Sequence, residues 1–281
     1  MNSTILFQIL TKEKDDLVGF ETTLIILFAL IIGSFLNVLI YRLPLGISLI
    51  HPKRSVCPNC NKIIAWYENI PVVSYLIIRG KCTTCHLPIS LKYPFVEIIT
   101  ALVSYLLFIK LGLTYEFYFI FIICSVLIVL SFIDLQYKAV PYTLLVILTF
   151  ITMLYLSIYK LANISDFFIF AGVIVIIDFF VTYYIQNIKS HFLKDDSLRE
   201  QKALGDGDIP IIALIGGILG LQFGVFAIFL SAILAIIPSI INMVFKKEIE
   251  TPFIPYLSLA FLITFLNQSS IYTILEGIQL G

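Results

Sequence analysis

The sequence predicts an all-α polytopic membrane protein with about eight transmembrane helices and a small polar module between the first and second helix. Hydrophobic residues make up 60% of the 281 residues and charged residues only 13%, the reverse of the balance in a soluble domain. Apolar runs recur along the chain at lengths near the ~20 residues that cross a bilayer. The only extensive polar segment, 44–93, holds four of the five cysteines. These observations exclude a water-soluble fold.

The helices follow from apolar runs bounded by charge, proline or glycine. We expect them near residues 22–42, 94–111, 115–133, 141–159, 166–186, 209–222, 224–245 and 253–275. The charged residues that precede the first run do not have the order of a cleavable signal peptide, so this run is expected to be retained as a span. The sixth run is short and contains Gly216, Gly217 and Gly220, small residues that permit close helix contact.

Three segments are expected from this pattern. Residues 1–43 form an outward-facing N-terminus and the first span, residues 44–93 a cytoplasmic zinc-binding module, and residues 94–281 a membrane domain of seven helices.

The distribution of basic residues predicts the orientation, because Lys and Arg are retained on the cytoplasmic side. Fourteen of the 18 basic residues fall on the face that carries the polar module: Arg42, Lys53, Arg54, Lys62, Arg79, Lys81, Lys92, Lys138, Lys189, Lys194, Arg199, Lys202, Lys246 and Lys247. Lys12, Lys14, Lys110 and Lys160 fall on the other face. The module and the turns on its face are therefore expected to be cytoplasmic. The 18 acidic residues balance the 18 basic ones, so overall charge gives no reason to expect a nucleic-acid partner.

Two CxxC pairs stand in the polar module, Cys57 with Cys60 and Cys82 with Cys85, separated by 21 residues. Four thiolates at this spacing are typical of a closed tetrahedral zinc site. Two disulfides are the alternative, but a reducing cytoplasmic face disfavours them. With every ligand position filled by cysteine, the zinc is expected to be structural. His86 adjoins Cys85 and is interpreted as a surface histidine.

Two aspartates stand at the ends of predicted spans, Asp134 at the end of the third and Asp208 at the start of the sixth. Two crossings separate them, so both are expected at the same face and depth, where an ionisable group is a functional candidate. Two adjacent carboxylates share a proton, as in aspartic proteases. Gly205 and Gly207 lie just before Asp208, and because they have no side chain they would let a substrate backbone approach this aspartate closely.

A structural interpretation of each aspartate stays open beside the catalytic one. Asp208 would cap its helix by accepting hydrogen bonds from the helix N-terminus, and Asp134 would end the third helix at the headgroups. Asp206 lies close enough to compete for the catalytic assignment, and Asp178 lies in the middle of the fifth span.

A longer series of matches resembles the type IV prepilin peptidases, which are membrane GxGD aspartic proteases. The matching residues are Gly33 to Val38, Tyr41 to Pro44, both CxxC pairs, Asn69 to Pro71, Ser74, Tyr75, Arg79 to Cys82, Ile89, Ser90, Tyr93, Pro94, Glu97, Asp134, Pro141, Gly205 to Asp208, Pro252, Phe253, Pro255 and Tyr256. They run in order from about residue 33 to residue 260. Two positions depart from the family pattern, Pro210 and Ile254, and neither changes a carboxylate.

The resemblance implies an eight-helix endopeptidase that removes the leader of type IV prepilins or of the pseudopilins of type II secretion at the cytoplasmic boundary of the bacterial inner membrane. It places the catalytic pair on Asp134 and Asp208, and substrate positioning on Gly205, Gly207 and Glu97. Family members with both CxxC pairs commonly also methylate the new N-terminus with S-adenosylmethionine. The partners implied are therefore prepilin or pseudopilin substrates and membrane lipid.

A secondary transporter is the alternative function, with Asp134, Asp178 and Asp208 binding protons or cations. That function predicts acidic residues spread through the membrane depth, whereas two of these three are expected at one face. A noncatalytic, zinc-bearing assembly platform is a further alternative.

Overall fold

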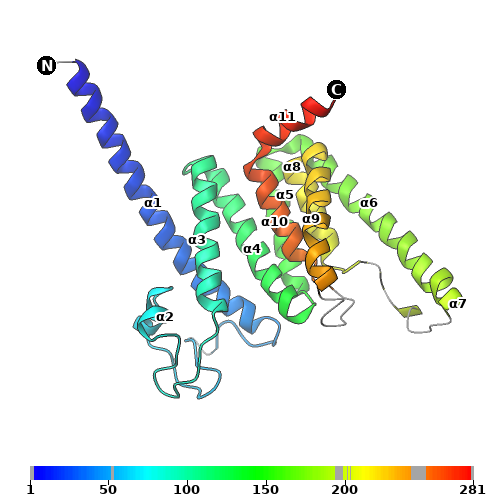
Figure 1. Ribbon diagram of the computed structural model, residues 1–281, viewed down its shortest axis with the longest axis horizontal. Helices are drawn as coiled ribbons and strands as arrows, with labels where there is room; N and C mark the ends of the chain where they lie inside the picture. The colour runs from blue at the N-terminus through cyan, green and yellow to red at the C-terminus, as the bar shows by residue number, and fades with distance from the viewer. Residues whose placement is uncertain are drawn as a thin grey trace. The chain divides into compact units, whose positions relative to one another are not determined.

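The computed structural model describes residues 3–51, 54–193, 199–200, 202, 204–241 and 251–279. This part of the chain is helical and contains no strand, only two isolated antiparallel bridges. The helical elements, labelled in Figure 1, are α1 (Ser3–Arg42), η1 (Trp66–Asn69), α2 (Val73–Ile77), α3 (Lys92–Leu111), α4 (Tyr115–Tyr137), α5 (Tyr142–Tyr159), η2 (Leu161–Asn163), α6 (Ile164–Tyr183), η3 (Tyr184–Lys189), α7 (Ser190–Leu193), α8 (Asp208–Leu219), α9 (Leu221–Ile241), α10 (Ile254–Leu266) and α11 (Gln268–Gln279).

Six segments of the described chain are long and apolar enough to cross a membrane: Gly19–Arg42, Lys92–Leu111, Tyr115–Tyr137, Tyr142–Tyr159, Leu161–Phe192 and Leu221–Ile241. Two further apolar helices are shorter, α8 with 12 residues and α10 with 13. At ~1.5 Å per residue each is about 20 Å long, less than the ~30 Å of a hydrocarbon core. The prediction of an all-α membrane fold with the cysteine module between its first two spans is confirmed.

The fifth span differs from its predicted end. Helical structure continues beyond residue 186 through the π-helical η3 into α7, because residues 184–193 contain neither proline nor glycine to stop it. Four basic residues used in the orientation argument, Lys53, Lys194, Lys246 and Lys247, lie outside the described residues.

The chain divides into two compact units, residues 1–125 and 126–281, with the boundary inside α4. In the first unit α1 packs along α3, as Figure 1 shows. Their backbones approach closely at Gly33, where a Cβ atom would lie 2.7 Å from Cα of Glu97. The small residue thus allows α1 to pack directly against the turn of α3 that carries this glutamate.

In the second unit α8 is the buried element, and it packs against α5, α6, α9 and α10. Ten of its 12 residues are buried, including Gly216 and Gly217. A Cβ atom at Gly216 would lie 2.1 Å from the ring of Phe170 on α6, so the glycine admits that ring against the helix backbone. This core fixes the N-terminal end of α8, where Asp208 lies.

Candidate active site and metal centre

Asp134 lies in the last turn of α4 and is buried, with 7% of its surface exposed. Its Oδ2 atom accepts a hydrogen bond from the backbone N–H of Ile254, at 3.2 Å. Ile254 is the first residue of α10, so the carboxylate receives a donor from the N-terminus of a helix. The packing of α10 therefore fixes the position of Asp134.

Asp208 is the first residue of α8 and is equally buried, with 7% of its surface exposed. Its backbone N–H donates to the carbonyl of Gly205 at 3.0 Å, which closes the turn that leads into the helix. Its carboxyl group also accepts a hydrogen bond from the backbone of Gly205. The two carboxyl groups belong to the same unit and are close enough to interact electrostatically.

The two loop glycines have different neighbours. A Cβ atom at Gly207 would lie 2.9 Å from Cγ2 of Val140 and 3.3 Å from Cδ1 of Ile254. A Cβ atom at Gly205 would instead lie 3.3 Å from Oδ2 of Asp208. Gly207 thus permits close packing of the loop, and Gly205 leaves space beside the carboxylate of Asp208.

Asp206 is held away from this site. Its side chain is about half exposed and pairs with Lys202 at 2.8 Å, and the hydroxyl of Tyr142 donates to it at 3.1 Å. The Lys202 ammonium lowers the pKa of Asp206. An ionised, solvated carboxylate with two partners suits a surface contact, which leaves Asp208 as the buried acid of the loop.

Two contacts at this site lie outside the sequence prediction. One is the backbone donor of Ile254, which no side-chain pattern reports. The other is Asp178 on α6, whose Oδ1 atom accepts the backbone N–H of Leu204 at 3.1 Å and interacts with the hydroxyl of Thr182 at 3.3 Å. The sequence did offer one indication of the Asp178 contact, because a carboxylate in the middle of an apolar helix is expected to have a polar partner.

The cysteines of the two CxxC pairs form a cluster whose four sulfur atoms all lie within 4.8 Å of one another. The Sγ atoms of Cys57 and Cys85 are 3.9 Å apart, as are those of Cys60 and Cys82. A zinc tetrahedron with ~2.3 Å bonds has edges of about 3.8 Å, whereas a disulfide bond is ~2.05 Å long. All four cysteines are free. The cluster therefore fits one tetrahedral metal ion.

Each CxxC pair forms the same turn. The residue after its second cysteine has a positive φ, 55° at both Asn61 and His86, and donates its N–H to the carbonyl of the pair's first cysteine, at 2.9 Å and 3.0 Å respectively. Asparagine and histidine are among the residues that tolerate this conformation best. His86 therefore has the same backbone role as Asn61.

A polar contact joins the two knuckles. Lys62 donates to Glu68 at 2.8 Å, and the hydroxyl of Thr83, between the second pair of cysteines, lies 2.6 Å from the same carboxylate oxygen. These bonds, that of Lys62 first, lower the pKa of Glu68 to about 2. The module thus carries an ionised glutamate that links its halves.

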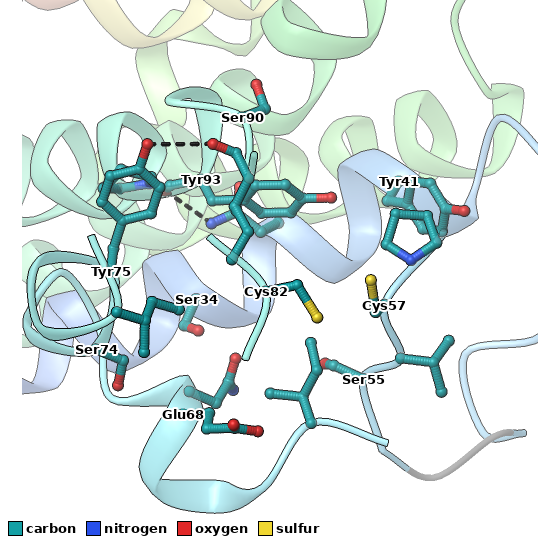
Figure 2. A pocket seen from close by; sticks show the side chains of 18 of the residues that line it. Ser34, Tyr41, Ser55, Cys57, Glu68, Ser74, Tyr75, Cys82, Ser90 and Tyr93 are labelled. Carbon is teal, nitrogen blue, oxygen red and sulfur yellow. Dashed lines mark hydrogen bonds between the residues drawn. The ribbon is translucent and has the colours of Figure 1, made fainter. Parts of the chain in front are cut away.

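Glu97 lies at the first turns of α3 and is buried, with 7% of its surface exposed. Its Oε2 atom accepts the N–H of Val72 at 2.7 Å, and the Ser34 hydroxyl also hydrogen-bonds the carboxyl group. Glu97 lines a cavity of the first unit, part of which is drawn in Figure 2.

Comparison with known proteins gives two family matches. Residues 27–111 match the bacterial peptidase A24 N-terminal domain, and residues 121–240 match the type IV leader peptidase family. No solved structure matches the chain at a significant level.

Several curated relatives carry the name prepilin leader peptidase/N-methyltransferase. That of Aeromonas hydrophila is 30% identical over 85% of this chain and 88% of its own length. That of Bacillus subtilis is 27% identical over 92% and 99%, and that of Myxococcus xanthus is 44% identical over 42% and 35%. The two family matches together cover both the cysteine module and the two aspartates. With the Aeromonas relative 30% identical over most of both chains, the chain belongs to the type IV leader peptidase family.

Proposed function

We propose that this chain is a membrane aspartic endopeptidase that removes the leader of type IV prepilins or pseudopilins and then methylates the new N-terminus. The observation that carries the peptidase half is the pair of buried carboxyl groups, Asp134 and Asp208, which interact at the ends of two helices in one unit. The relatives' names support the class of substrate and the second activity.

The proposed cleavage uses one proton shared between the two acids. The ionised aspartate takes a proton from a water molecule, and the water oxygen forms a bond to the carbon of the scissile carbonyl. The protonated aspartate donates its proton to the carbonyl oxygen, which gives a neutral tetrahedral diol. On collapse, the aspartate that took the water proton passes it to the leaving nitrogen, one diol hydroxyl returns its proton to the other aspartate, and the C–N bond breaks to release the new amine. The backbone donor of Ile254 and the turn at Gly205 hold the two acids for these steps.

The proposed location is the cytoplasmic boundary of the bacterial inner membrane. A prepilin has a basic leader in water followed by an apolar helix in lipid, so its cut site lies at headgroup depth. Asp134 ends an apolar helix and Asp208 begins one, a placement that suits a bond at that depth. Gly205 leaves space beside Asp208 for the substrate backbone.

The proposed metal is zinc, held by Cys57, Cys60, Cys82 and Cys85. Four cysteine ligands leave no position for a water molecule, so the ion would stabilise the fold of the knuckles rather than take part in cleavage. The proposed methyl donor, S-adenosylmethionine, supplies a methyl group to the amine nitrogen, with the C–S bond breaking onto sulfur and the amine losing a proton.

The test of the peptidase proposal is cleavage of a prepilin by the purified full chain in detergent. We expect Asp134→Asn and Asp208→Asn each to reduce cleavage by about 1,000-fold or more, because neither variant keeps a shared proton between two carboxyl groups. Asp206→Asn is the matched control, since it makes the same change in the same loop, and it should retain cleavage.

Thermal unfolding of each variant would show that its fold is kept. Cleavage at the wild-type rate by both active-site variants would overturn the proposal. Proton or cation uptake into vesicles that depends on both aspartates, without cleavage, would favour the transporter alternative instead.

A further inference from the structure

The segment that forms η1 and α2 exposes apolar side chains, although it belongs to the polar module between α1 and α3. Three of them, Val73, Leu76 and Ile77, have the i, i+3 and i+4 spacing that places side chains on one face of a helix. The exposed set, here called the η1–α2 patch, is Trp66, Tyr67, Ile70, Val73, Leu76 and Ile77. Trp66 and Ile77 are the most exposed of the six, at 79% and 73%. An apolar patch of this kind on a module in water would need a partner.

The polar groups of the same segment point inward. Ser74 is buried, and its hydroxyl donates to the carbonyl of Tyr67 at 2.7 Å and accepts the N–H of Ile70 at 2.8 Å. The hydroxyl of Tyr75 donates to the carbonyl of Ile89 at 3.1 Å, a bond drawn as a dashed line in Figure 2. Polar atoms that are satisfied inside the protein, with apolar side chains outside, are what a bilayer requires of a segment that it surrounds.

The level of the segment along α3 indicates how deep it lies. The N–H of Val72, just before α2, donates to Oε2 of Glu97 at 2.7 Å. Glu97 stands five residues after Lys92, where α3 begins, which is about 7.5 Å along the axis at ~1.5 Å per residue. The 20 residues of α3 are about 30 Å long and match the hydrocarbon core of a bilayer. Val72 is therefore expected to lie below the surface of the bilayer rather than above it.

The contacts of α1 give a similar depth. The hydroxyl of Ser34 also hydrogen-bonds the carboxyl group of Glu97, and Ser34 stands eight residues before Arg42, the last residue of α1, which is about 12 Å. Val72 has a φ of 59°, a conformation that β-branched residues seldom adopt. Because the buried Glu97 accepts the N–H of this residue, the turn that leads into α2 is held against both spans.

The charge of the module suits a position at an anionic membrane surface. Residues 44–93 contain six basic residues and one acidic residue, and that acid, Glu68, is paired with Lys62. Three exposed basic residues follow the patch along the chain: Arg79, Lys81 and Lys92. Anionic headgroups attract basic residues beside a membrane, and Trp and Tyr are enriched at the interface between lipid and water.

We propose that the η1–α2 patch is embedded in the lipid leaflet on the module's side of the membrane, at the depth of the headgroups and the first acyl carbons. The patch acts as an interfacial anchor and holds the two cysteine knuckles against the bilayer surface. This proposal depends on neither the peptidase nor the methyltransferase activity. In the proposed orientation of the chain, the leaflet is the cytoplasmic one.

A second copy of the chain is the competing occupant of the patch, because exposed apolar patches also form protein interfaces. The depth of the segment favours lipid, since lipid already surrounds the spans at the level of Glu97. The two occupants are distinguished by which quencher reaches the patch.

Trp66 is the only tryptophan of the chain, so its fluorescence reports on the patch alone. The test places the zinc-loaded full chain in vesicles of phosphatidylcholine and phosphatidylglycerol. We expect blue-shifted emission, strong quenching by lipids brominated in their acyl chains, and weaker quenching by aqueous acrylamide than that of free tryptophan amide. Emission and acrylamide quenching like those of an indole in water would overturn the proposal. Protection from both quenchers would also overturn it, because protein would then cover the patch.

Ile77→Asp should move the patch toward water, because a carboxylate is costly in lipid. We expect this variant to lose quenching by the brominated lipids and to gain quenching by acrylamide. Thr84→Asp is the matched control, since it adds the same charge at an exposed position of the second knuckle, and it should be quenched as the wild type is. The zinc content of each variant shows whether its module is folded. Quenching by brominated lipid that falls equally in both folded variants would mean that the charge of the module, and not contact of the patch with lipid, determines the signal.

Discussion

Gly207 is a residue at which one added methyl group should disturb the loop of Asp208. Its Cβ atom would press on Val140 at 2.9 Å and on Ile254 at 3.3 Å, and Ile254 also donates to Asp134. We expect Gly207→Ala to destabilise the protein by about 1–3 kcal/mol. We also expect it to reduce cleavage, because relief of the clash would shift the loop before Asp208 and would shift Ile254, whose N–H holds Asp134. Thermal unfolding and initial cleavage rates measure the two effects.

Gly172→Ala is the control for this prediction. Gly172 lies on α6 in the same unit, and nothing lies within 4 Å of the position its Cβ would take, so alanine should be neutral or slightly stabilising there. An unchanged cleavage rate and unfolding temperature in Gly207→Ala would show that the loop has more room than the structure gives it.

Asp178 is expected to act as a positioning residue, because it accepts the N–H of Leu204 just before the loop of the second acid. Asp178→Ala removes the acceptor and should lower kcat by about 10-fold with little change in KM. Asp178→Asn keeps an oxygen acceptor and should restore most of the rate.

The comparison of these two variants distinguishes positioning from other roles of Asp178. Equal loss in Asp178→Ala and Asp178→Asn would mean that the charge matters rather than the hydrogen bond. A fall in unfolding temperature without a change in kcat would mean that the contact only stabilises the fold.

The residues of the site were predictable from sequence to the extent that their side chains carry the chemistry. Asp134 and Asp208 stand at the ends of apolar runs. Two predicted spans separate them, so the sequence alone predicts that both lie at the same face of the membrane. The donor of Ile254 is a backbone group, so no residue type encodes it. The same holds for Gly207, whose closeness to Val140 depends on how distant helices pack.

The cysteine knuckles are the element whose fold should depend most on a bound ion. Within its described part, the module has only two isolated β-bridges and two short helices, η1 and α2, and no longer helix or strand. We expect the purified chain to contain about one zinc per molecule, and a strong chelator or Cys60→Ser to expose residues 54–91 to limited proteolysis.

Cys124→Ala provides the matched control, since Cys124 is buried in α4 and does not belong to the cluster. It should retain the zinc and the protease resistance of the module. A module that resists proteolysis equally well after the metal has been removed would show that its hydrogen bonds, such as those of Glu68, suffice to hold the knuckles.

The helices were predictable as apolar runs, but hydropathy alone did not predict where they end, because the ends depend on individual glycine and proline residues. The sixth run was expected to reach residue 222, whereas α8 ends at Leu219 and Gly220, with a φ of 80°, separates it from α9. Pro210 fits because it lies in the first turn of α8, where no helical donor is lost. In contrast, the fifth run continues as a helix beyond its last long apolar stretch.

At the scale of the whole molecule, the features of the two proposed activities lie in different parts of the chain. The cysteine cluster, Glu97 and the cavity belong to the unit of residues 1–125, and the two aspartates to the unit of residues 126–281. The two family matches divide in a similar way, at 27–111 and 121–240.

The distribution of basic residues makes a prediction about the whole chain in its membrane. Turns on the lysine-poor face should be outside and those on the lysine-rich face inside. We therefore expect Thr114→Cys and Ala162→Cys, both at exposed positions of turns, to react with an impermeant maleimide on intact cells. Ala139→Cys, also exposed and five residues after Asp134, should react only after the membrane is opened. Labelling of Ala139→Cys from outside would place the acid pair on the outer face, where a leader that stays in the cytoplasm could not reach it.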